Sequence, residues 1–444
     1  MKETILGLIK QGRYSDARQI TTELNVVDAA HLFEEMDPQH LLIVFRILPK
    51  DFSSDVFTHM PSELQETVIN SMTDEEAIRI FDDLFLDDAV DFLEEMPSNV
   101  VKRILENSTE DSRRLINQFL NYPEDSAGSL MTIEYVGLKK EMSVRQALQY
   151  IKDNGVDKRT INTCYVMDGS RVLEGVIPLR KLVLSDESAV VADLMDTDYI
   201  SIKTHDDQEE VAALFQKYDY YIMPVVDNEN RLVGIITVDD ILDVMEEEAT
   251  EDLQKMAAMQ PSEKEYLKTS NWELARNRLP WLLLLMIGAT FTGGIIKRYE
   301  SALQSVLILA SFIPMIMDTG GNSGSQSSTL VIRGLAVGEI QTRDASKVMG
   351  KEFAVSGIVG LVLALVNFLR IYLLEGTNVL IALTVSITLF FTVVLAKIVG
   401  SILPIIAKKL KLDPAIMAGP LITTIVDAAA LLVYFSVATV LLGL

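Results

Sequence analysis

Residues 276–444 hold nearly all of the long apolar runs in this 444-residue chain, and this uneven distribution constrains the fold more than any other feature. A helix needs about 20 predominantly apolar residues to cross a hydrocarbon layer about 30 Å thick. Five runs reach or approach this length, at about 279–296, 305–332, 353–374, 379–407 and 415–442. We therefore predict a C-terminal transmembrane domain of five helices, residues 276–444.

The charged residues are distributed just as unevenly. Residues 276–444 contain 13 basic and 8 acidic residues, whereas residues 1–275 contain 26 basic and 55 acidic ones. This acidic first part would repel nucleic acid and anionic lipid head groups, so we expect cations, and no nucleic acid, as its partners. An acidic surface that serves only solubility is the alternative.

Basic residues at the ends of the apolar runs predict how the chain is oriented. They precede the first run and follow the second and the fourth, and ends with such residues normally lie in the cytoplasm. The residues concerned are Arg276, Arg278, Arg343, Lys347, Lys351, Lys408, Lys409 and Lys411. We expect a multi-pass protein of the cell membrane, with its acidic part cytoplasmic and its C-terminus outside. Lys297 and Arg298 fit this topology less well.

A repeat of twelve residues marks the first hundred residues. Helix-starting residues such as Asp37-Pro38 and Thr73-Asp74 follow several of the repeated apolar positions, because Pro suits the first helical position and Asp or Thr can cap it. The repeated positions are Met36, Leu48, Met60, Met72, Leu84 and Met96. Each unit predicts one short helix that buries its apolar face only by stacking. We predict an α-helical superhelical repeat domain over residues 1–122.

Strands that alternate with short helices follow, and this pattern occurs twice. The first copy extends from Leu130 to Leu182 and the second from Leu194 to Ile241, and in each an apolar strand leads directly into a helix. The pattern resembles a tandem pair of α/β CBS domains, which we place at residues 123–243. Such pairs are sensing modules, and in many families they hold an adenine nucleotide.

The residues for nucleotide binding match only in the second copy. Thr237 and Asp240 fit that role there, whereas Pro178 and Arg180 replace the comparable polar positions of the first copy. Binding of ATP therefore stays open at this point.

An acidic segment follows, and its pattern predicts a helix from Asp243 to Lys268. Glu248, Glu251 and Asp252 are three or four residues apart, so they share one face of a helix. A solvated face is the ordinary explanation of such a run, but its place between a sensing module and the membrane favours regulation. We predict an acidic connecting, or plug, helix over residues 244–275.

Asp427 lies about twelve residues into the last apolar run, which places it about 18 Å along a helix and near the midplane of a membrane. A carboxylate there costs roughly 2.5 to 3.5 kcal/mol on insertion scales and normally faces water, an ion or a partner. A carboxyl group neutralised by a proton or by a neighbouring helix is the alternative. We expect Asp427 to line a pore.

The second apolar run contains an unusual polar stretch, D-T-G-G-N-S-G-S-Q at 318–326. Small residues let helices approach closely, and broken turns expose carbonyl groups, so the stretch should be buried in protein and line a pathway. A tight packing seam between helices is the alternative, and the two roles can coexist. Lys397 in the fourth run is expected to snorkel or to be paired.

The candidate pore residues all offer oxygen ligands, and no His or Cys occurs in any of the five runs; they are Asp427, Asp318, Asn322, Thr423 and Thr424. Oxygen ligands suit magnesium, calcium or manganese. Magnesium holds its water tightly, so a pore with few carboxylates could bind the hydrated ion. A symmetric dimer would bring two Asp427 carboxylates to one axis and supply the charge that a divalent ion requires.

Two motifs in the membrane part are specific: P-M-I-M-D-T-G-G-N-S-G-S-Q at 314–326 and D-P-A-I-M-A-G-P-L-I-T-T-I-V-D at 413–427. Together with the repeat domain, the CBS pair and the acidic helix, they resemble the MgtE family of magnesium transporters over the whole chain. The resemblance implies a homodimeric magnesium channel in the lipid bilayer, closed by its own cytosolic domains when intracellular magnesium is high. No phosphate-binding loop or nucleophile constellation is recognisable, and we expect no enzyme.

The resemblance also implies that Mg²⁺ binds several regulatory acids, besides the pore acid Asp427. They are Asp207, Glu209 and Asp219 in the second CBS copy, and Asp240, Asp243, Glu248, Glu251 and Asp252 along the connecting helix, with Asp87, Asp88, Asp91 and Asp55 matching more loosely in the repeat domain. Two carboxylates about 4 Å apart repel by roughly 4 kcal/mol at an effective dielectric of 20. Facing acidic surfaces should therefore separate unless cations lie between them.

Two alternatives stay open. One is a membrane-bound sensor of magnesium or of a nucleotide that conducts nothing, although a sensor has no need of an acid at the membrane midplane. The other is a broader pathway that also admits cobalt or manganese.

Overall fold

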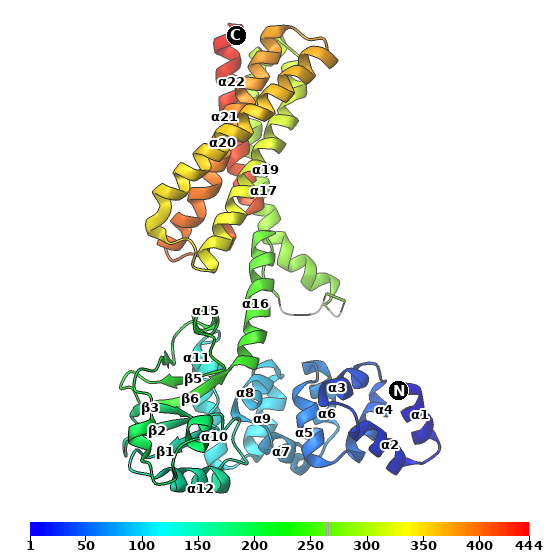
Figure 1. The fold of residues 1–444 in the computed structure, drawn as a ribbon. Coiled ribbons are helices and arrows are strands. Elements are labelled where there is room, and N and C mark those ends of the chain that lie inside the picture. Colours follow the sequence, from blue (N-terminus) through cyan, green and yellow to red (C-terminus); the bar gives the residue numbers. More distant parts are fainter. Residues whose placement is uncertain (263, 265, 268, 444) are drawn as a thin grey trace. The chain divides into compact units, whose positions relative to one another are not determined.

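The computed structural model describes residues 1–262, 264, 266–267 and 269–443, and it consists of two compact units, Met1–Met245 and Glu246–Leu444 (Figure 1). Helix α16 (Val238–Met256) contributes to both units. Each unit has hydrophobic clusters of its own.

Unit 1 begins with an array of short helices, drawn from blue to cyan in Figure 1. They are α1 (Lys2–Lys10), α2 (Tyr14–Thr22), α3 (Val26–Glu34), α4 (Pro38–Ile47), α5 (Lys50–Thr58), α6 (Ser62–Asn70), α7 (Asp74–Asp82), α8 (Leu86–Glu95), α9 (Ser98–Asn107) and α10 (Glu110–Phe119). From α4 to α9, each predicted twelve-residue unit is one helix. Asp37 caps α4, and Thr73 and Glu76 form a capping box at α7, as the sequence indicated.

Aromatic residues at the same spacing of twelve connect these helices. Phe33, Phe45 and Phe57 are buried, and consecutive ring centroids lie 6.4 Å apart in edge-to-face contact. Burying one such side chain contributes about 1.5–3 kcal/mol, and the ring geometry adds to it. The row of rings therefore stabilises the stack that no single helix could hold.

The second part of unit 1 contains two three-stranded sheets with the same topology. In each, the first two strands are parallel and the third is antiparallel to the second. The elements are α11 (Ala127–Leu130), β1 (Val136–Leu138), α12 (Val144–Asn154), β2 (Thr163–Met167), β3 (Leu173–Pro178), α13 (Leu179–Val183), α14 (Val191–Leu194), β4 (Ile202–Lys203), α15 (Gln208–Tyr218), β5 (Ile222–Val226) and β6 (Leu232–Thr237), followed by α16. The predicted duplication is present.

The two copies exchange their first residues. Thr132, at the start of the first copy, pairs with Ile235 on β6 of the second, through two main-chain hydrogen bonds of 2.8 Å. Asp196, at the start of the second copy, pairs in the same way with Val176 on β3 of the first. The close approach requires a glycine, since a Cβ on Gly234 would lie 2.7 Å from the carbonyl oxygen of Thr132.

Helix α16 is shorter than predicted. It ends at Met256, whereas the sequence pattern favoured a helix as far as Lys268, which lies outside the described residues. Ala258 has a φ of +53°, and the N–H of Met259 donates to the carbonyl of Gln254, 3.0 Å away. This is a Schellman-type helix end. The prediction of one helix through residues 244–275 is wrong after Met256, because the pattern of acidic residues carried no signal of this end.

Unit 2 continues with the helices of the apolar part. They are α17 (Asn271–Arg298), α18 (Glu300–Ser305), α19 (Leu309–Ala336), the 3₁₀ turn η1 (Thr342–Asp344), α20 (Ala345–Leu369) with a π-helical end η2 (Arg370–Leu374), α21 (Val379–Lys409), the 3₁₀ turn η3 (Pro414–Met417) and α22 (Gly419–Leu442). Among the residues that the structure describes, four segments are long and apolar enough to cross a membrane: Asn271–Arg298, Thr342–Leu374, Val379–Lys409 and Pro414–Leu442. Helix α19 has the length of a span, and it contains the polar stretch.

The polar stretch of α19 remains helical and packs tightly against α21 and α22. A Cβ on Gly400 of α21 would lie 2.2 Å from the carbonyl oxygen of Gly324, so position 400 has room only for a glycine where these backbones touch. A Cβ on Gly321 would lie 2.8 Å from the methyl carbon of Thr423 on α22. The glycines thus form the packing seam that the sequence left as an alternative, without the broken turns that we had expected.

Candidate functional site

Asp427 is positioned by the turn that starts α22. Asp413 caps η3 by accepting a hydrogen bond of 2.8 Å from the N–H of Ala415, and α22 follows directly. The oxygen Oδ1 of Asp427 is buried and has no hydrogen-bond partner. Such an atom keeps its full capacity to accept a ligand, and leaving it buried and unpaired is costly.

Thr423 and Thr424 lie one turn before Asp427 and face different neighbours. Thr423 packs against Gly321 of α19, whereas Thr424 packs against Gly288 of α17. Both hydroxyl groups donate to main-chain oxygens of the preceding turn, those of Gly419 and Pro420, over 2.9 Å. Each hydroxyl oxygen can still accept a hydrogen bond from the water of a hydrated ion. Of the two threonines, only Thr423 lies on the side of α22 that contacts α19.

Asp318 and Asn322 lie one turn apart on α19, and both side chains are exposed in unit 2. The carboxylates of Asp318 and Asp427 lie close enough to repel each other. The polar stretch thus has two sides. Its glycines lie in the packing seam between helices, whereas Asp318 lies on an exposed side near Asp427. Two neighbouring carboxylates suit a divalent cation better than a monovalent one.

Lys397 on α21 is buried, with only 5% of its surface exposed. Its ammonium donates to the hydroxyl oxygen of Ser327 on α19 over 3.3 Å, and Ser327 donates to Glu352 on α20 over 2.6 Å. The sequence predicted a snorkelling or paired lysine, and the structure has one linked to an acid through a serine. These hydrogen bonds link α19, α20 and α21, and Lys397 makes no ion pair with Asp427.

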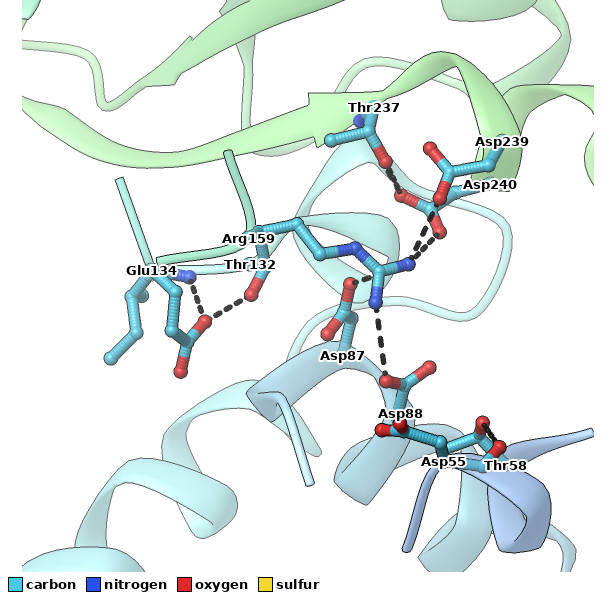
Figure 2. A network of polar contacts seen from close by, with 11 residues as sticks. Asp55, Thr58, Asp87, Asp88, Thr132, Glu134, Arg159, Thr237, Asp239 and Asp240 are labelled. Carbon is cyan, nitrogen blue, oxygen red and sulfur yellow. Dashed lines mark hydrogen bonds and ion pairs between the residues drawn. The ribbon is translucent and has the colours of Figure 1, made fainter. Parts of the chain in front are cut away.

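A second cluster lies in unit 1, around Arg159 in the loop between α12 and β2 (Figure 2). The guanidinium lies 3.3 Å from Asp88, 3.2 Å from Asp239, 3.2 Å from Asp240 and 4.0 Å from Asp87. The first turn of α8 carries Asp87 and Asp88, and the first turn of α16 carries the other two. The structure thus brings together three predicted regulatory acids, around a cation that the sequence reasoning did not identify.

The pKa values in this cluster reflect burial first and charge second. Burial raises the pKa of Asp87 well above its usual range, repulsion by Asp88 adds to the rise, and Arg159 opposes it. Burial also raises the pKa values of Asp88 and Asp240. For Arg159, burial works against the charge, but the four carboxylates outweigh it and raise the pKa. The guanidinium therefore remains charged, and it offsets part of the rise in the pKa values of Asp87, Asp88 and Asp240.

The other two predicted acids of the repeat domain lie on exposed faces. Asp55 is on α5, and its main-chain oxygen accepts a hydrogen bond from Thr58 over 2.9 Å. Asp91 is on α8, one turn after Asp87. Protein atoms crowd its carboxylate although the side chain keeps an exposed face, and this desolvation, with repulsion by Glu94, raises the pKa of Asp91 to about 8.

The acids predicted in the second copy of the duplicated module lie at opposite ends of α15. Asp207 caps its start by accepting from the N–H of Glu209 over 2.9 Å, whereas Asp219 ends it with a φ of +54°. An eleven-residue helix is about 16 Å long. Asp219 and the other two therefore do not form one group within the chain.

A lysine also contacts the acidic run on α16. Lys255 contacts Glu251, one turn earlier, over 2.6 Å and Asp413 of η3 over 2.7 Å. Burial opposes its charge, but hydrogen bonds to both carboxylates raise the pKa of Lys255. Burial and repulsion by Asp413 raise the pKa of Asp252. Two other predicted residues, Asp243 and Glu248, are also on this helix.

Thr237 and Asp240, the candidates for nucleotide binding, contact each other. The hydroxyl of Thr237 donates to Oδ2 of Asp240 over 2.6 Å, while Oδ1 of Asp240 accepts from Arg159. Across the described part of the chain, no three carboxylate, His or Cys side chains are grouped so as to hold a metal ion. The predicted metal ligands therefore remain predictions, and the acids around Arg159 and Lys255 are held by side chains of the same protein.

Family models match three parts of the chain. A divalent cation transporter model, MgtE, matches residues 313–437, a model of the MgtE intracellular N domain matches residues 24–125, and a CBS domain model matches residues 191–247. The magnesium transporter MgtE of Thermus thermophilus is 35% identical over 437 residues, which is 98% of this chain and 97% of that protein.

The chain belongs to the MgtE family. The magnesium transporter MgtE of Bacillus subtilis is 37% identical over 98% of this chain and 96% of its own length. Two solved structures resemble somewhat more than half of the chain. The soluble part of a magnesium transporter has a TM-score of 0.53 and 28% identity, and covers 56% of this chain and 98% of its own. The cytosolic domain of the Mg²⁺ channel MgtE in complex with ATP has a TM-score of 0.53 and 33% identity, and covers 55% of this chain and 100% of its own.

These comparisons confirm the predicted fold class and the resemblance on which it was based. The chain has an N-terminal helical repeat domain, a CBS pair and a C-terminal region with apolar helices, as expected for a membrane protein of the MgtE family with a soluble cytosolic part.

Proposed function

We propose that this protein is a magnesium channel or transporter of the cell membrane that mediates Mg²⁺ influx. The observation that carries the proposal is Asp427, which has a buried and unpaired carboxylate oxygen inside apolar helix α22. The relatives that match nearly the whole chain are magnesium transporters, which supports the same function. Because these relatives are transporters, we infer movement of an ion down its gradient and no catalysis.

A homodimer would complete the pore. One Asp427 carries a single negative charge, whereas two copies related by a twofold axis would offer two carboxylates to one hydrated ion. Four further residues would line the same path: Asp318, Asn322, Thr423 and Thr424. Thr423 packs against α19, the helix that carries Asp318. The basic ends of the spans support a cytoplasmic unit 1 and an external C-terminus.

We further propose that cytosolic Mg²⁺ closes this pore. The repeat domain (1–122), the CBS pair (123–243) and the acidic connecting segment (244–275) would sense the ion, and residues 276–444 would conduct it. The candidate ligands are the predicted acids Asp55, Asp87, Asp88, Asp91, Asp207, Glu209, Asp219, Asp240, Asp243, Glu248, Glu251 and Asp252. Binding would favour the compact arrangement in which these acids face each other.

ATP is proposed as a second ligand of the CBS pair. One related cytosolic domain was solved in complex with ATP. Asp240 would have to exchange its contact with Arg159 for the nucleotide, so ATP and the cluster around Arg159 would be coupled.

A broader divalent cation transporter is the second candidate. The matching family model is described as a divalent cation transporter, and oxygen ligands that act through bound water discriminate weakly between Mg²⁺, Co²⁺ and Mn²⁺. Competition of each ion with Mg²⁺ uptake would separate the two candidates.

Growth of a bacterial strain without its own magnesium transporters tests the function. We expect the wild-type protein to restore growth at low Mg²⁺ and Asp427→Asn to fail, with Glu300→Gln as a matched change at an exposed acid of α18. Surface expression is measured for all three. Equal rescue by Asp427→Asn would remove this residue from the pathway, and a well-expressed wild type that does not rescue would favour a sensor without conduction.

A further inference from the structure

The junction around Arg159 is held by the chain's own positive charge. The guanidinium contacts Asp87 and Asp88 at the start of α8, and Asp239 and Asp240 at the start of α16 (Figure 2). Arg159 itself belongs to the first copy of the CBS pair, and α16 follows the second copy. One side chain therefore bridges the repeat domain and both CBS copies.

The position of Arg159 is fixed from several sides. Its main-chain N–H donates to the carbonyl of Glu134 over 2.9 Å. The guanidinium carbon lies 5.1 Å from the ring centroid of Phe85, the residue that precedes α8, and the side chain is only 18% exposed. A planar guanidinium that lies over an aromatic ring and among carboxylates is a well-defined contact, unlike that of a flexible surface arginine.

Asp87 depends on that cation more than any other acid of the junction. It is 4% exposed, and neither carboxylate oxygen has a hydrogen-bond partner. Among the described residues, its ion-pair partner is Arg159. A buried carboxylate that loses its only counter-charge is strongly destabilising. Without Arg159, Asp87 and Asp88 would also repel Asp240 across the junction.

We propose that Arg159 is a resident cation that keeps the repeat domain docked on the CBS pair when no metal ion is bound. Its regulatory consequence rests on the proposed function. A ligand shifts a conformational equilibrium only through different affinities for the two states. A junction that an arginine already neutralises leaves little for Mg²⁺ to add. Asp87, Asp88 and Asp240 therefore drop out of the candidate Mg²⁺ ligands, and magnesium control falls to the other acids, above all Glu248, Glu251 and Asp252.

Hydrogen exchange of the full-length protein in detergent tests the proposal. The peptides to compare contain the first turn of α8 and residues 155–162, in EDTA and in saturating Mg²⁺. In the wild type, we expect both peptides to be protected to the same degree in the two conditions. In Arg159→Met, exchange in EDTA should be about tenfold faster or more, and Mg²⁺ should restore protection, because the ion can now replace the missing charge.

Three further variants define the cause. Lys158→Met removes the neighbouring positive charge, which takes no part in the network, and should behave as the wild type. Arg159→Lys keeps the charge without the planar fork and should be intermediate. Asp87→Asn combined with Arg159→Met removes one of the repelling carboxylates, so it should exchange more slowly in EDTA than Arg159→Met alone.

Two results would overturn the proposal: wild-type protection that appears only with Mg²⁺, or Arg159→Met that exchanges like the wild type in EDTA. If Arg159→Met also loses protection in strands β5 and β6, the double variant decides. A double variant as well protected in EDTA as the wild type would show that docking does not need Arg159 and would contradict the proposal. The exchange data do not involve transport. A failure of the magnesium uptake assay would therefore leave this result standing, and the reverse also holds.

Discussion

The two acidic sites of this protein differ in what balances their charge. Around Arg159, four carboxylates surround one guanidinium, which belongs to the same chain. At Asp427, no Lys or Arg of the described residues forms an ion pair. The buried Lys397 of α21 is linked to Glu352 through Ser327 instead.

The difference separates two uses of a buried acid. A carboxylate with a tethered counter-charge gives a contact of fixed geometry, which suits a junction between domains. A carboxylate without one can be neutralised by a mobile ion that arrives and leaves, which suits conduction. We therefore propose that a positively charged side chain beside a buried acid marks a structural role, and that its absence marks an acid that binds a transported ion.

The largest expected effect on transport comes from placing a positively charged side chain next to Asp427, like the one that Asp87 and Asp88 have in Arg159. Thr423→Lys would place an ammonium one helical turn before Asp427, where it can neutralise the carboxylate and repel a divalent ion. We expect Mg²⁺ uptake into proteoliposomes to fall on the order of a hundredfold, because a repulsion of a few kcal/mol opposes entry of the ion. Thr423→Met has similar length without charge and serves as the control. Equal loss in both variants would attribute the effect to bulk against Gly321 and contradict the electrostatic comparison.

An intermediate effect is expected on α16, where Lys255 balances only part of the acidic run. Replacing Glu248 and Glu251 by Gln and Asp252 by Asn should raise the cytosolic Mg²⁺ concentration for half-inhibition about tenfold, since each lost ligand weakens binding to the closed state. Patch recordings measure it. The control neutralises three exposed acids of the CBS pair, Asp157, Asp193 and Glu210. Unchanged inhibition would remove this helix from the gate.

The smallest effect concerns Asp91, whose exposed face limits the contribution of its charge. The pKa of this carboxyl is raised to about 8 in the folded protein, so the group favours folding fully below its unfolded pKa, and this contribution is lost as the pH rises through about 8. The melting temperature of the repeat domain should therefore fall slightly between pH of about 6 and about 9. Asp91→Asn should flatten this slope, and an unchanged slope would assign it to other groups.

The sequence predicted regular features well because local chemistry determines them. The twelve-residue spacing from Met36 to Met96 predicted one short helix per unit, and each helix from α4 to α9 is such a unit. The position of Asp427 within the last apolar run needed only the rise of a helix. In contrast, the end of α16 at Met256 depends on a left-handed Ala258, for which alanine carries no signal.

The partners of the acids could not be predicted in the same way. Arg159 is 71 residues from Asp88 along the chain, and Lys255 is far from Asp413 as well, so only the tertiary fold brings these charges together. Neither cation stands in a motif. The list of regulatory acids came from the resemblance to a family. Such a resemblance does not predict which lysine or arginine of this chain pairs with each acid.

The exchange of first residues between the CBS copies limits how this protein can be divided. Strands β3 and β6 each end their sheet, and an uncovered sheet edge invites pairing with other chains. Asp196 covers the edge of β3 and Thr132 that of β6, each from the opposite copy. A protein made from the second copy alone would lack Thr132 and would present an open edge at β6. Because each copy covers the strand edge of the other, we expect either half made alone to expose an open edge that pairs with other chains.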